Sequence, residues 1–110
     1  MPDIDPGSLA NEMLKAASGV LRDRWPDVKG YAEMEFKKAA ETIAAIQRMR
    51  LVGEITEEQA RLLMEMQKHA MRSVMTAVEI MSVVAAEQAI NAAIGAVRKT
   101  VNTALGFVLL

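Results

Sequence analysis

The sequence has no cysteine, few aromatic residues and no proline after residue 26. Without cysteine, disulfides, thiolate metal sites and cysteine nucleophiles are all excluded. The 13 basic residues do not outnumber the 14 acidic ones, so the chain lacks the positive excess that binds a phosphate backbone, and we expect no nucleic-acid partner. Hydrophobic residues make up 52% and aromatics only 4%, with nine methionines, a composition that favours an all-α fold.

The beginning of the chain does not resemble a secretory signal. Met1-Pro2-Asp3 and the residues after it are acidic where a signal peptide is basic and then apolar. We therefore expect a cytoplasmic location rather than secretion by a signal peptide, while the compartment stays open.

The length suits one domain, with 1–7 as an irregular lead-in and 8–110 as a single helical domain.

Two helices are expected in the first half of the chain. Ser8 is a suitable N-cap for a helix over about 9–24, which Trp25-Pro26 should end because the residue before proline is disfavoured in a helix. A second helix is expected over about 27–51. Its apolar residues recur every three or four positions and form one face, made of Val28, Ala32, Phe36, Ala39, Ile43 and Ile46.

The clearest local signal is the segment Thr56-Glu57-Glu58-Gln59, which has the pattern of a capping box. The first glycine after it is Gly95, so a third helix is expected over about 57–104, roughly 70 Å at 1.5 Å per residue. The short link makes helices two and three an antiparallel hairpin. The long third helix exceeds its partner, so we expect the hairpin and the shorter N-terminal helix to assemble into an oligomeric helix bundle.

The third helix carries two apolar stripes. One should pack on helix two and consists of Leu62, Met66, Ala70, Ala77, Met81 and Val84. The opposite stripe is predicted to be the oligomer interface, formed by Met64, Met71, Met75, Val78, Ala86, Ala89 and Ala93. Polar residues on the inward side could form a layer across chains that fixes register, made of Glu87, Gln88 and Asn91.

One histidine and two glutamates are the candidate metal ligands. Antiparallel pairing brings Glu35 towards Glu65 and His69, near the middle of the hairpin. Carboxylates with an imidazole suit iron or manganese, and a second chain would complete the site. The arrangement resembles the ferritin-like carboxylate proteins built from one hairpin per chain. That family uses Glu-x-x-His, whereas Glu65 and His69 are four apart, and an ion-paired surface flank is the competing interpretation.

A membrane-associating or pore-forming role for 73–110 is the other alternative. The apolar end of the chain could contact lipid, but Glu79 and Glu87 would each cost about 3 kcal/mol near a bilayer centre.

The leading prediction is a non-enzymatic module that binds a second copy of itself or a helical partner and needs no cofactor. The metal protein, with iron or manganese, ranks second, and no catalytic residue is predicted.

Overall fold

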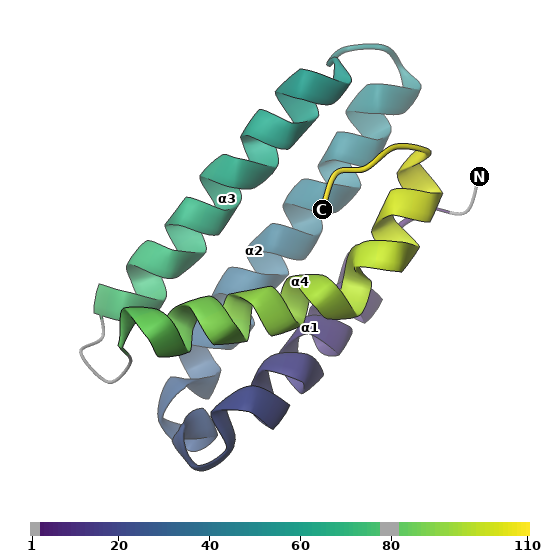
Figure 1. The fold of residues 1–110 in the computed structure, drawn as a ribbon. Coiled ribbons are helices and arrows are strands. Elements are labelled where there is room, and N and C mark those ends of the chain that lie inside the picture. The colour runs from purple at the N-terminus through teal and green to yellow at the C-terminus, as the bar shows by residue number, and fades with distance from the viewer. Residues whose placement is uncertain (1–2, 78–81) are drawn as a thin grey trace.

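The computed structural model describes residues 3–77 and 82–110. The described residues form four α-helices, namely α1 (Pro6–Leu21), α2 (Trp25–Leu51), α3 (Glu57–Ala77) and α4 (Val83–Leu105). Consecutive helices are neighbours, and α4 returns to pack mainly against α1 (Figure 1). The all-helical class predicted from composition is thus confirmed, in the form of a bundle closed within one chain.

The first two helices begin earlier than predicted. The N-cap of α1 is Asp5, whose carboxylate accepts from Gly7 N at 3.1 Å and from Ser8 Oγ at 2.9 Å. Ser8 therefore lies inside the helix, because Pro6 is favoured in a first helical turn. Pro26 occupies the first turn of α2 in the same way, so the proline opens the second helix instead of ending the first.

A short 3₁₀ turn, η1 (Arg22–Arg24), separates α1 from α2. Arg22 has a φ of 49°, in the region that L-residues rarely adopt. Its backbone N–H donates to Ser18 O, which closes the last turn of α1. The chain then reverses direction, and α1 and α2 pack as antiparallel neighbours.

The single helix predicted over 57–104 is wrong. Ser82 has an extended backbone, with φ −70° and ψ 161°, and its hydroxyl accepts from Ala85 N at 3.1 Å. It is the N-cap of α4, and a serine in this role stabilises a helix start. The chain therefore changes direction before α4, which folds back onto the same bundle instead of extending 70 Å away from it.

This reversal buries the stripe that was assigned to an oligomer interface. Met64, Met71 and Met75 lie in the core of the single chain, together with Ala86, Ala89 and Ala93. Val78, the seventh predicted interface residue, is outside the described residues. The apolar surface that exceeded what one hairpin could cover is buried inside the single chain. There α3 packs mainly on α2, and α4 packs mainly on α1.

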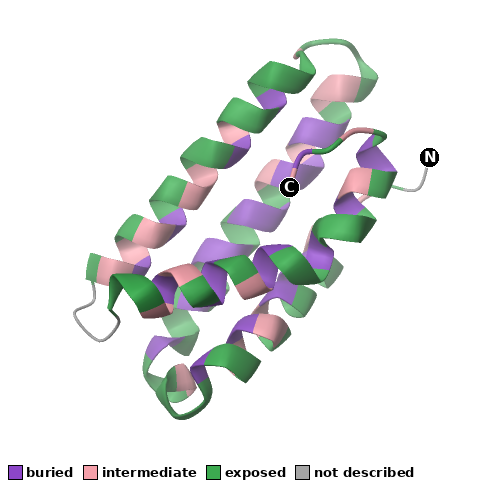
Figure 2. Ribbon diagram, viewed as in Figure 1, coloured by how far each residue is buried: buried purple, intermediate pink, exposed green. Residues whose placement is uncertain are grey.

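The faces of α3 are the reverse of the prediction. Its outward side carries Leu62, Met66, Ala70 and Ala77, all exposed, while the inward side is buried (Figure 2). The physical reason lies in the polar residues that share the Leu62 side of the helix. Burying the Leu62 side would also bury His69 and Ser73, whereas the observed rotation leaves both exposed and avoids their desolvation.

Candidate functional site

An exposed apolar strip runs along the outside of α3. We call Leu62, Met66, Ala70 and Ala77 the α3 outer face. Leu62 is 61% exposed and Met66 is 59% exposed. Residues four apart lie one above the other on a helix, so these two side chains form one continuous apolar surface on the solvent side.

Paired charges border this face on the same helix. Glu65 lies 3.3 Å from Lys68 Nζ, and both groups belong to α3. The imidazole of His69 contacts Arg72, with Nδ1 3.1 Å from Nη1. Because the guanidinium has no acceptor, Nδ1 accepts the hydrogen bond. These contacts hold the charged groups beside the face, with Lys68 and Arg72 partly buried, and leave the apolar strip uncovered.

The three candidate metal ligands do not form a cluster. Glu35 is only 2% exposed and its carboxylate is 3.3 Å from Lys38 Nζ. Glu65 and His69 are exposed on α3, each with the cationic neighbour described above. Within residues 3–77 and 82–110, no group of three His, Cys, Asp or Glu side chains is placed to hold a metal ion. In the described residues, the carboxylates of Glu35 and Glu65 each face a lysine instead of one another.

The predicted polar layer is also distributed differently. Gln88 and Asn91 are exposed, since the neighbouring alanines of α4 point inward. Glu87 is partly exposed and forms an ion pair with Arg72 of α3. This pair joins two helices of one chain close to the point where α4 begins, so its role here is to tie α4 to α3.

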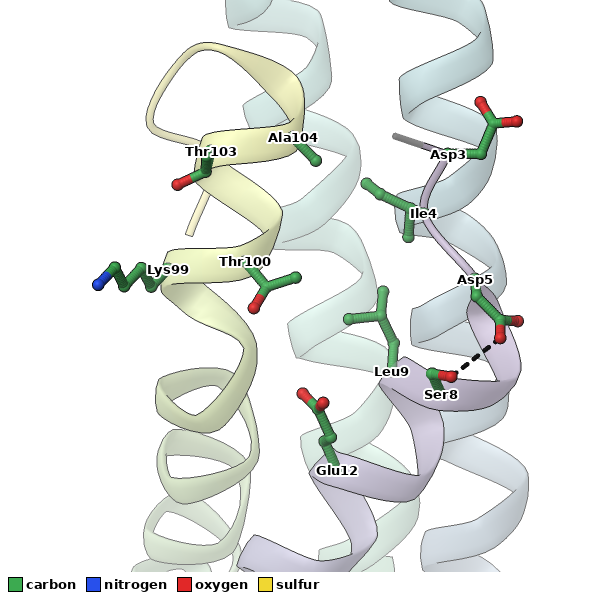
Figure 3. Close-up of a pocket in the computed structure, with 10 residues that line it drawn as sticks. All are labelled: Asp3, Ile4, Asp5, Ser8, Leu9, Glu12, Lys99, Thr100, Thr103 and Ala104. Carbon is green, nitrogen blue, oxygen red and sulfur yellow. Dashed lines mark hydrogen bonds between the residues drawn. The ribbon is translucent and has the colours of Figure 1, made fainter. Parts of the chain in front are cut away.

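A groove of about 490 Å³ lies between the start of α1 and the last turns of α4 (Figure 3). Ile4, Leu9 and Ala104 provide apolar surface in it, and Glu12 extends from α1 into the space between the helices. Asp5, also in the lining, is engaged in capping α1. The full lining comprises Asp3, Ile4, Asp5, Ser8, Leu9, Glu12, Lys99, Thr100, Thr103 and Ala104.

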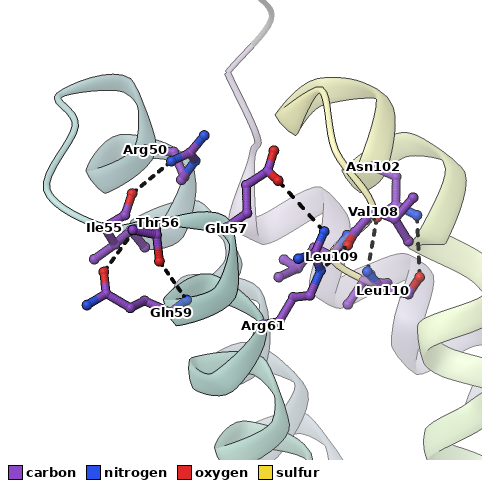
Figure 4. A network of polar contacts seen from close by, with 10 residues as sticks. All are labelled: Arg50, Ile55, Thr56, Glu57, Gln59, Arg61, Asn102, Val108, Leu109 and Leu110. Carbon is purple, nitrogen blue, oxygen red and sulfur yellow. Dashed lines mark hydrogen bonds and ion pairs between the residues drawn. The ribbon is translucent and has the colours of Figure 1, made fainter.

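The last residues of the chain sit in a cradle that sequence analysis missed. We use cradle for Arg50, Arg61 and Asn102, which come from α2, α3 and α4 (Figure 4). Gly106, with φ 78°, ends α4 in the left-handed conformation and reverses the chain. The side chain of Leu109 then reaches the core. The glycine after a helical run was the one signal in the sequence for this reversal.

Hydrogen bonds hold the segment in the cradle. Asn102 Oδ1 accepts from the backbone N–H groups of Leu109 and Leu110, both at 3.0 Å, and Asn102 Nδ2 donates to Leu110 O at 3.4 Å. Arg61 Nε donates to Val108 O at 2.9 Å. The cradle thus satisfies backbone groups that no helix or strand partner reaches.

Comparison of the chain with protein-family models, curated proteins and solved structures finds no match. Among the described residues, no helix combines the length and apolar character needed to cross a membrane.

Proposed function

We propose that the chain is a non-enzymatic assembly module that binds a second copy of itself through the α3 outer face. The main support is the exposure of Leu62 and Met66, whose surfaces are each more than half accessible to solvent. The other methionines in the described part of α3 are buried. Covering an apolar surface is favourable by about 25 cal/mol per Å² removed from water, and contiguous exposed apolar surface marks interaction sites.

The chemistry of this face suits a helical partner surface. Methionine is flexible and adapts to irregular apolar surfaces, and Ala70 and Ala77 add small side chains that allow close approach of another helix. A second copy offers the same apolar strip, and a two-fold contact between identical faces covers both at once. The bordering charges of Glu65 and Arg72 stay at the polar rim of such a contact.

Light scattering after size-exclusion chromatography tests the proposal. We expect wild-type protein to self-associate at concentrations on the order of micromolar, a range in which specific interfaces of moderate affinity form. The variant carrying Leu62→Lys with Met66→Lys should be monomeric and equally helical. A matched variant, Gln88→Lys with Asn91→Lys, adds the same charge at exposed positions of α4, outside the α3 outer face, and should still associate. A wild-type monomer throughout would contradict the proposal.

A further inference from the structure

We infer that the cradle is a receptor for a short segment of a partner protein that carries an aromatic residue followed two positions later by leucine. Residues 107–110 of this chain occupy the receptor in cis. This goes beyond the proposed function, since the cradle and the α3 outer face are different surfaces, and it names a second partner by its chemistry.

The cradle recognises backbone atoms that every peptide has. Asn102 contacts two successive N–H groups and one carbonyl, and Arg61 contacts the carbonyl of Val108. These four hydrogen bonds come from side chains of α3 and α4. A segment from another protein could therefore make the same set, provided that it adopts the backbone conformation of residues 107–110, in which two successive N–H groups point to one acceptor.

Side-chain specificity comes from two positions. The guanidinium carbons of Arg50 and Arg61 each lie 5.5 Å from the centroid of the Phe107 ring. At this distance a cation is attracted to an aromatic ring. Leu109 is buried in the core, whereas Val108 between them is 65% exposed. The alternation of inward, outward and inward side chains gives the aromatic-x-Leu pattern and leaves the middle position free.

The cis segment competes with any segment in trans. It is tethered through Gly106, and a short tether gives an effective concentration in the millimolar range. An incoming segment must displace residues 107–110, so the intact chain should bind it weakly until its own segment leaves. The arrangement works as an autoinhibitory contact at the cradle.

Fluorescence anisotropy on the full chain tests this inference. The probe is a fluorescein-labelled, C-terminally amidated peptide of residues 106–110 behind a Ser-Gly spacer. Phe107→Ser with Leu109→Ser should leave the cradle of the protein empty, and we expect this variant to bind the probe at least about tenfold more tightly than wild type, because millimolar cis competition is removed. The single variant Val108→Ser alters only the outward side chain and should behave as wild type.

Two controls define specificity. A peptide with serine in place of both the phenylalanine and the first leucine should not bind, and adding Arg61→Gln and Asn102→Ala to the emptied variant should abolish binding of the probe. Equal binding of both peptides, or equal affinity of wild type and emptied variant, would overturn the inference.

A measurement on wild-type protein covers the case in which the emptied variant fails to fold. Millimolar probe should displace the cis segment and accelerate hydrogen exchange at the amides of Leu109 and Leu110, as seen by NMR. Unchanged exchange at these two amides in the presence of the probe would also refute the receptor.

Discussion

Thr42 of α2 donates a hydrogen bond to Gln67 of α3, with Oγ1 and Oε1 3.0 Å apart. This contact lies between two partly buried side chains and places Gln67 on the side of α3 that faces α2. With Gln67 facing α2, Met64 and Met71 turn into the core and Met66 turns outward. One polar pair thus marks which of two apolar stripes is buried.

Two methionines five positions apart on α3 should respond very differently to truncation. Met71→Ala removes a fully buried side chain and should lower the free energy of unfolding by about 2–5 kcal/mol, through lost burial and the remaining cavity. Met66→Ala, on the α3 outer face, should change it by less than about 0.5 kcal/mol. Urea unfolding of the monomer, followed by circular dichroism, measures both, and similar losses would contradict the observed rotation of α3.

Removing the amide of Asn102 should detach residues 107–110 and destabilise the bundle. Asn102→Ala eliminates three hydrogen bonds to Leu109 and Leu110 and should cost about 1–3 kcal/mol, the range for leaving partly buried polar groups unsatisfied. Asn91→Ala, at an exposed position of α4, is the matched control and should be close to neutral. Urea titration gives the free energies of unfolding. Equal values for the two variants would show that the hydrogen bonds of Asn102 do not stabilise the fold.

The serine that starts α4 should contribute measurably to stability. Ser82→Ala removes the hydroxyl that accepts from Ala85 N, and loss of an N-cap typically costs about 1 kcal/mol. The control is Ser73→Ala on the exposed side of α3, where alanine is the better helix former, so its stability should not fall. A thermal melt that ranks Ser82→Ala at or above wild type would argue against the cap.

Loading with Fe(II) or Mn(II) tests the ferritin-like alternative. A metal that binds only the folded chain raises its stability, by about 2.7 kcal/mol at a hundred times the dissociation constant. Because Glu35 and Glu65 each face a lysine and lie outside any three-ligand cluster of the described residues, we expect an unchanged melting temperature. A rise that Glu35→Gln or His69→Ala removes would support a site completed between chains.

Local features of the sequence were predictable because neighbouring residues produce them. The capping box is present as expected, with Thr56 N donating to Gln59 Oε1 at 2.9 Å and Gln59 N donating to Thr56 Oγ1 at 3.1 Å. Helical class and the end of α2 near Leu51 follow from composition and short-range pattern. The break at Ser82 was missed, since one serine among good helix formers is a weak signal until tertiary contacts make the reversal favourable.

The candidate site was harder to predict because it depends on contacts between distant residues. An apolar stripe in sequence does not reveal whether a neighbouring chain or the same chain covers it. The cradle joins residues of α2, α3 and α4 around Phe107, so no local window contains it. The three candidate metal ligands come from one region of the hairpin. Each of them contacts a cationic side chain of its own helix instead of the other two candidates.

By itself, the sequence determined that the chain is helical, where α3 begins and that more apolar surface exists than one hairpin can bury, because propensity, capping and composition act locally. Only the tertiary structure decided which stripe is inside. The return of α4 onto α1 buries the Met64, Met71 and Met75 face within the chain and leaves Leu62 and Met66 in solvent. That outcome follows from the cost of removing His69 and Ser73 from water. This cost depends on which face of the whole helix is packed, and it cannot be read from any one residue.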